Sequence, residues 1–198
     1  IDDKTIKQLM TMQEDLHFGI GRKRKKSSIG IHDLDKISFP LIYTTVSRNH
    51  KFIPLNSEKE LSISEIIADT ETGKDYGHLL GQSSQVPIII DTNEKTVSFP
   101  PIINAAITTV TTKTKNLFVE VTGINKQDAE DMLSIVATIL QSAGFTLEHV
   151  QISGAKNSSP KFQEKKMIVD PSLINQTLGL DLNASKIITS LKKSRLAA

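Results

Sequence analysis

The chain contains no cysteine and no tryptophan, and only 5% of its residues are aromatic. The absence of cysteine excludes disulfides, thiolate metal sites and a cysteine nucleophile, and it is typical of a reducing compartment. No apolar run approaches the roughly 18 residues needed to cross a bilayer. No export signal is recognisable, and the chain begins at Ile1 rather than methionine. We therefore expect a cytoplasmic fragment of a larger protein, with no contact to membranes.

The remaining composition is that of a folded domain with an aliphatic core. Of 198 residues, 38% are hydrophobic and 23% are charged, which suffices for one sizeable core and an appendage. The net charge of +2 is too small to identify a nucleic-acid-binding protein by itself.

One run of adjacent basic residues concentrates positive charge: Arg22, Lys23, Arg24, Lys25 and Lys26. Such a run is either a solvated loop or a contact for the phosphates of a nucleic acid. No aromatic residue interleaves it, so the pattern favours contact with the sugar-phosphate backbone over stacking on bases.

Apolar residues recur at helical spacing in some segments and alternate in others, which predicts an α+β fold. Helical spacing predicts helices over residues 4–17, 126–143, 171–178 and 184–193. A capping box at Ser62 opens a further short helix. Apolar segments bounded by turns predict strands over residues 28–34, 41–47, 51–55, 86–91, 96–99, 116–122 and 145–152. We expect a largely antiparallel sheet with packed helices.

The segment Gly154–Pro160 has the composition of a linker. The roughly 38 residues beyond it are too few to bury a full core of their own. We therefore divide the chain into a domain at residues 1–155 and a segment at 156–198. The second part would hold the linker and the truncated start of a following domain.

Glu120 is a single carboxylate in the strand Leu117–Gly123, between Val119 and Val121. Because strand side chains alternate, Glu120 and the two valines must point to opposite faces. If the valines pack in the core, Glu120 lies on a solvated face. If Glu120 is itself buried, it needs a partner there, and that partner can be a ligand.

Ser98 precedes Phe99-Pro100-Pro101, where two prolines end an apolar strand. Its hydroxyl either caps the turn or binds a polar substrate beside the bend. The segment lacks the G-x-S-x-G pattern of serine hydrolases, and we reject a catalytic triad.

The segment His32-Asp33-Leu34-Asp35 places three possible metal ligands within four residues. Metal sites need ligands that converge, usually from distant segments, and no second cluster accompanies this one. The pattern favours a turn capped by aspartate, and we expect no metal site.

Taken together, these segments resemble the beta chain of phenylalanyl-tRNA synthetase, of the archaeal and eukaryotic cytosolic type. The resemblance extends over nearly the whole chain, and its most specific parts are H-D-L-D and S-F-P-P-I-I-N. The matching segments run in order: 15–17, the basic run, 29–37, 52–55, 87–91, 98–104, 118–123, 174–175 and 178–179.

The resemblance implies that residues 1–155 are the editing domain of that chain, which hydrolyses tyrosine mis-attached to the phenylalanine tRNA. Residues from about 163 would begin a winged-helix-like domain. The positions that match the family's editing pocket are Ile89, Ser98, Glu120 and Thr122. Glu120 would accept the phenol O–H and Ile89 would contact the ring, whereas Ser98 and Thr122 would position the ester or the attacking water.

The resemblance also implies a parent enzyme that joins phenylalanine to its tRNA with ATP and Mg²⁺. That centre belongs to the alpha subunit of a heterotetramer, so this fragment would carry no aminoacylation site and no cofactor. Two other interpretations stay open. In one, the chain is a non-catalytic module that docks tRNA or the alpha subunit. In the other, it is a basic-patch RNA-binding domain without an amino-acid site.

Overall fold

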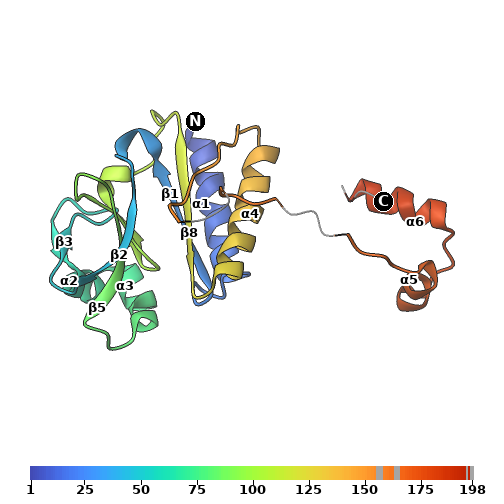
Figure 1. Ribbon diagram of the computed structural model, residues 1–198, viewed down its shortest axis with the longest axis horizontal. Coiled ribbons are helices and arrows are strands. Elements are labelled where there is room, and N and C mark those ends of the chain that lie inside the picture. The colour runs from blue at the N-terminus through green and yellow to red at the C-terminus, as the bar shows by residue number, and fades with distance from the viewer. Residues whose placement is uncertain (155–157, 163–165, 195, 197–198) are drawn as a thin grey trace. The chain divides into compact units, whose positions relative to one another are not determined.

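The computed structural model describes residues 1–154, 158–162, 166–194 and 196 (Figure 1). The chain divides into two compact units, Ile1–Lys161 and Phe162–Ala198. Of the proposed linker, residues 155–157 lie outside the described residues. No helix in the described part of the chain is long and apolar enough to cross a membrane.

Two long helices pack on one side of a two-stranded sheet in the first unit (Figure 1). The sheet is formed by β1 (Ser27–Asp33) and β8 (Leu117–Gly123), which run antiparallel with Gly30 opposite Glu120. The helices are α1 (Asp3–Phe18), capped by Asp2, and α4 (Lys126–Ser142), capped by Asn125. Their apolar faces bury one face of the sheet in a core that contains Leu9, Ile29, Ile31, Met132, Val136 and Leu140.

A four-stranded antiparallel sheet follows the order β2-β5-β6-β7. The strands are β2 (Ile42–Ser47), β5 (Gln85–Ile90), β6 (Thr96–Phe99) and β7 (Ile103–Asn104). The helices α2 (Ile63–Asp69) and α3 (Glu71–Tyr76) lie beside this sheet (Figure 1). A second core includes Phe52, Ile63, Ile66, Val86, Ile88, Phe99, Ile102 and Ala105.

Short elements connect these layers. The strands β3 (Lys51–Phe52) and β4 (Leu61–Ser62) form a further two-stranded sheet, and three 3₁₀ turns lie at Leu34–Lys36, Gly77–Leu80 and Ala106–Thr108. The predicted capping box at Ser62 is present, with Glu65 as its partner.

Two of the expected strands differ from the structure. The strand expected over 51–55 ends at Phe52, and Pro54 makes an isolated bridge to Ala105. Residues 145–152 form no strand, although Val150 makes an isolated bridge to Ser159. Phe145 and Leu147 pack against the core under α4 instead, so their alternation serves the packing of an irregular segment.

The second unit contains two short helices, as the sequence predicts. Helix α5 (Pro171–Leu178) has Asp170 as its cap and ends at Gly179 in the left-handed conformation. Helix α6 (Ala184–Lys193) is capped by Asn183, and Asn175 fastens the connection by hydrogen bonds with the backbone of Leu182. The winged-helix-like character of this unit remains a prediction.

Candidate functional site

A hollow of about 170 Å³ lies at the polar faces of the two larger sheets. Antiparallel pairing places Ser28 and Gly30 on the same face of the two-stranded sheet as Glu120 and Thr122. On the four-stranded sheet, Tyr43, Ile89, Ser98 and Asn104 form a row across neighbouring strands. The polar residues that line the hollow are Gln13, Glu14, Arg24, Ser28, Thr72, Ser98, Asn104 and Glu120.

Glu120 is largely shielded from solvent, with only 10% of its side chain exposed. Its Oε1 atom lies 3.9 Å from Nε2 of His32, and its Oε2 atom has no hydrogen-bond partner among the described residues. The solvated-face alternative for this carboxylate is therefore wrong. Both faces of β8 are covered: Val119 and Val121 contribute to the core under the helices, and Glu120 faces the hollow. A buried acceptor without a partner is costly unless a ligand or water satisfies it.

The other three predicted pocket residues take different places around Glu120. Ser98 lines the hollow, is 2% exposed, and donates a hydrogen bond to Oδ1 of Asn104 at 3.2 Å. Thr122 does not line the hollow itself. Its hydroxyl forms a hydrogen bond of 2.9 Å with the hydroxyl of Ser28, which does line it. Ile89 is buried directly opposite Ser98 in the sheet but is not part of the lining.

Tyr43 stands at the edge of the same row, opposite Ile89, with 63% of its surface exposed. Burial of part of the ring, and then the charge of nearby Glu120, raise the pKa of the Tyr43 phenol. The carboxylate therefore acts electrostatically on this phenol, which is the chemical group of the substrate implied by the family resemblance.

Arg24 departs from the expectation that all five basic residues face a nucleic acid. Only 10% of its side chain is exposed. Its guanidinium donates to the carbonyls of Pro101 and Ile102, pairs with Glu14 at 3.1 Å, and lies 4.2 Å from the ring centre of Tyr76. These contacts hold the two terminal nitrogens of Arg24 in the wall of the hollow, whereas its buried Nε atom has no hydrogen-bond partner among the described residues.

The rest of the basic run lies nearer the surface. Arg22, Lys23 and Lys25 are exposed, whereas Lys26 pairs with Asp128 at 3.1 Å. Three consecutive residues, from Arg22 to Arg24, have left-handed backbone angles, with φ of 49°, 53° and 61°. This turn sends Arg24 inward while its neighbours stay outside, and non-glycine residues adopt it only where surrounding contacts hold them.

Glu14 joins Arg24 to the buried His17. His17 donates through Nδ1 to Glu14 at 3.3 Å, because its Nε2 already accepts the backbone N–H of Ile29. The His17 hydrogen bond, and then the Arg24 charge, hold the pKa of Glu14 below its ordinary value of 4.5, against the opposing effect of burial.

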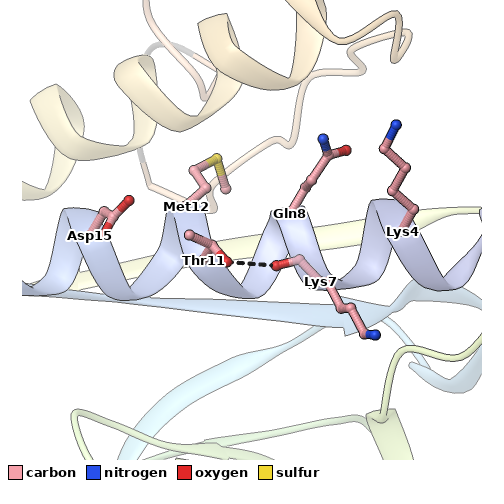
Figure 2. A pocket seen from close by; sticks show the side chains of 6 residues that line it. All are labelled: Lys4, Lys7, Gln8, Thr11, Met12 and Asp15. Carbon is pink, nitrogen blue, oxygen red and sulfur yellow. Dashed lines mark hydrogen bonds between the residues drawn. The ribbon is translucent and has the colours of Figure 1, made fainter.

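A larger hollow of about 640 Å³ runs along α1 (Figure 2), and Glu120 is not among the residues that line it. It is lined by Lys4, Lys7, Gln8, Thr11, Met12 and Asp15, all from this one helix. Figure 2 shows the long side chains of Lys4 and Gln8 projecting from the helix. No buried group of the described residues points to chemistry there, so we place the candidate site at Glu120.

The segment His32-Asp33-Leu34-Asp35 contains the expected aspartate-capped turn. Asp33 accepts the backbone N–H of Asp35 and the hydroxyl of Thr114. Within the described ranges, no group of three or more histidine, aspartate or glutamate side chains could hold a metal ion. His32 itself turns into the site beside Glu120.

Sequence reasoning did not predict several residues in or beside this site, among them His32, Arg24 as a wall residue, Tyr43, Asn104 and Gly30. Asn104 was visible in S-F-P-P-I-I-N, and its Nδ2 reaches the carbonyl of Ile31 at 3.5 Å. Gly30 and His32 alternate with the apolar Ile29 and Ile31, which could have marked a second buried face. No local signal places Tyr43, because it arrives from another sheet.

Comparison with known protein families shows the class of protein to which the chain belongs. Residues 15–134 match the B3/4 domain family. This match covers more than half of the chain and includes the four predicted pocket residues, and the chain belongs to this family.

The individual proteins that the chain resembles include phenylalanine–tRNA ligase beta subunits. The chain is 40% identical over its whole length to the phenylalanine–tRNA ligase beta subunit of Methanosphaera stadtmanae. It is 41% identical, over 98% of its length, to that of Sulfurisphaera tokodaii. The chain spans 36% of the length of each of these relatives.

A solved structure has the same fold. It is an N-terminal fragment of the phenylalanyl-tRNA synthetase beta subunit from Pyrococcus horikoshii, with a TM-score of 0.85 and 33% identity. The match covers 95% of this chain and 55% of that chain. The α+β class with antiparallel pairing and packed helices is thereby confirmed.

Proposed function

We propose that this chain is the proofreading module of a phenylalanyl-tRNA synthetase beta subunit, which hydrolyses the ester of tyrosine mischarged on the phenylalanine tRNA. The observation that carries the proposal is the buried Oε2 of Glu120, an acceptor that faces a hollow and lacks a partner among the described residues. The names of the relatives supply the enzyme to which the module would belong.

The size and chemistry of the hollow suit a phenol. A cavity of about 150 Å³ lined by apolar groups is known to accept benzene, and this hollow measures about 170 Å³. Phenylalanine would leave the Glu120 acceptor unsatisfied, whereas tyrosine would donate its hydroxyl to it. Sites of this kind reject the analogue that lacks the hydroxyl by roughly 10⁴ to 10⁵.

Ser98 and Thr122 would serve the other end of the substrate. The proton of the Ser98 hydroxyl is donated to Asn104, which leaves the Ser98 oxygen free to accept a bond from the aminoacyl group or from water. Thr122 would act through Ser28, the hydroxyl that it bonds and that reaches the hollow. An aminoacyl ester is activated, so a positioned water, assisted by a ribose hydroxyl of the tRNA, suffices without a covalent nucleophile.

The parent enzyme, on this proposal, joins phenylalanine to its tRNA with ATP and Mg²⁺ at a centre on the alpha subunit. The module itself needs no cofactor for hydrolysis. Its partners would be the phenylalanine tRNA, the tyrosyl group and the alpha subunit, in the cytoplasm.

The test uses the 198-residue chain and phenylalanine tRNA that has been mischarged with tyrosine. We expect deacylation by the wild-type chain and a loss of tyrosine selectivity in Glu120→Gln, which keeps the size but removes the anionic acceptor. Glu148→Gln, at an exposed acid, is the matched control. Equal selectivity for tyrosyl- over phenylalanyl-tRNA in the wild type and Glu120→Gln would refute the role of Glu120.

A non-catalytic docking module is the second candidate. The exposed cations Arg22, Lys23 and Lys25 favour it, since they can contact tRNA phosphates whether or not the hollow is used. Titration with free tyrosine separates the two: binding that Glu120→Gln weakens supports proofreading, and salt-dependent tRNA binding without any tyrosine binding supports docking.

A further inference from the structure

We propose that His32 is the positioning residue for Glu120: it donates through Nε2 to Oε1 and so keeps Oε2 a hydrogen-bond acceptor for the substrate. This inference rests on the proposed function and deepens it, because it explains how one buried carboxylate stays selective for a hydroxyl donor.

A hydrogen bond to Thr108 satisfies one nitrogen of the His32 ring. The Thr108 oxygen lies 2.8 Å from Nδ1 of His32, and either atom can be the donor there. The same hydroxyl lies 3.2 Å from the carbonyl of Ala105. Nδ1 of His32 therefore has a partner in either tautomer.

The other ring nitrogen then faces Glu120. His32 is fully buried, and its Nε2 atom has no hydrogen-bond partner among the described residues. If Nε2 carried no proton, its lone pair would face Oε1 of the carboxylate across 3.9 Å, and two acceptors cannot satisfy each other. A proton on Nε2 lets the ring donate to the carboxylate.

The separation of 3.9 Å exceeds that of a formed hydrogen bond, which is about 2.7–3.2 Å. Bonds within unliganded sites are often long and tighten when the substrate arrives. A small turn of the Glu120 side chain closes this distance, and the space for that turn comes from Gly30.

Gly30 lies opposite Glu120 in the strand pair. A Cβ atom at Gly30 would stand 2.5 Å from Oε1 of Glu120 and 2.6 Å from Nε2 of His32. The missing side chain thus leaves room at the point where the two groups approach each other.

The surrounding charges leave this task to His32. Arg24 shares the hollow, but its terminal nitrogens bond Pro101, Ile102 and Glu14, and it forms no ion pair with Glu120 in the described part of the chain. A buried carboxyl without a hydrogen-bond donor tends to take a proton itself and then acts as a donor as well as an acceptor. With His32 holding the proton at Oε1, Oε2 only accepts.

The experiment is nitrogen NMR of the 198-residue chain labelled with ¹⁵N-histidine at pH 7. We expect Nε2 of His32 to be protonated in the wild type and to change to the unprotonated type in Glu120→Gln. His17 is the internal control, because its Nε2 accepts from the backbone of Ile29 and should remain unprotonated in both proteins. An unprotonated Nε2 of His32 in the wild type, or the same protonated signal in both proteins, overturns the proposal.

A binding measurement gives the second readout. His32→Gln retains an amide that can donate toward Glu120, whereas His32→Leu has no donor. We expect His32→Leu to lose about 10- to 100-fold of the preference for tyrosine over phenylalanine, the worth of one hydrogen bond to a charged group, and His32→Gln to restore part of it. An unchanged preference in His32→Leu overturns the proposal. If the wild type binds no tyrosine, the proofreading function fails by itself, and the NMR result still decides the His32–Glu120 pair.

Discussion

Gly30, Glu120 and His32 show how a site depends on single positions. A strand of seven buried residues, β1, offers polar side chains on one face and Ile29 and Ile31 on the other. The polar face is tolerated because it meets hydroxyls, an imidazole and a carboxylate from other elements. At its centre the chain needs a residue with no side chain, since Oε1 of Glu120 occupies the space that a methyl group would fill.

Gly30→Ala should therefore destabilise the fold and reduce tyrosine binding together. Overpacking of this kind costs about 1–3 kcal/mol. Replacing Glu120 by alanine removes one of the two atoms that clash, so the double variant Gly30→Ala/Glu120→Ala should lose less stability than the two single variants summed. Denaturant unfolding of the four proteins in this cycle measures the coupling. Strict additivity would mean that the methyl group is accommodated elsewhere.

Glu14 gives a prediction for pH. Its pKa is lowered in the folded chain, chiefly by the hydrogen bond from His17 and then by Arg24, so folding favours the ionised form. That contribution is present above its ordinary pKa of 4.5 and is lost as the pH falls through the lower, folded value. Glu14→Gln should melt at a lower temperature than the wild type at pH 7, and the difference should shrink on acidification. A difference that is constant from pH 7 to below about pH 4 would contradict the assignment.

At the scale of elements, the period of the apolar residues predicted most of the fold. Helices α1 and α4 were found because each packs one stripe against β1 and β8, so the 3.6-residue period is visible in the chain. The orientation of Glu120 was not predictable in the same way. Alternation says that two faces of a strand differ, and it does not say whether the polar face meets water or a second sheet.

The strand predicted over residues 145–152 is absent from the structure for a related reason. Its alternating residues Phe145 and Leu147 are partly buried against the core, but among the described residues no strand pairs with the segment beyond the single bridge from Val150 to Ser159. Pairing is a property of two segments, and one segment's pattern cannot specify it. The site residues from β2 and the loop at Arg24 escaped prediction likewise, because tertiary contacts bring them to Glu120.

Helix α4 provides the test at this scale. Met132 is fully buried against β1 and β8, whereas Ile139, another apolar residue of the same helix, is 39% exposed. Met132→Ala should lower the free energy of unfolding by about 2–5 kcal/mol. Ile139→Ala, the matched control, should cost clearly less. Equal losses in urea denaturation would show that the exposed end of the stripe is covered in solution.

At the scale of the whole first unit, two helix-covered sheets turn their polar faces toward one hollow. The helices bury the apolar outer faces, so stability comes from the two cores while the shared interior remains free for chemistry. The residues of the basic run have two different locations. Arg24 lies in the wall of the hollow, whereas Arg22, Lys23 and Lys25 lie on the surface. If the proposed function holds, substrate selection and tRNA binding should therefore be separable.

That separation predicts the behaviour of a triple variant, Arg22→Gln/Lys23→Gln/Lys25→Gln. Each phosphate contact contributes about 0.7–0.9 to the slope of the logarithm of affinity against that of salt concentration, so losing three contacts should reduce the slope by about 2–3. The matched control neutralises three exposed lysines of helix α6, Lys186, Lys192 and Lys193, for the same change in net charge. Filter binding of the phenylalanine tRNA across a salt series measures the slope, and titration with free tyrosine should give equal affinities for both variants. An equal fall in slope for the two variants would mean that the tRNA responds to total charge, and that the loop makes no contact of its own.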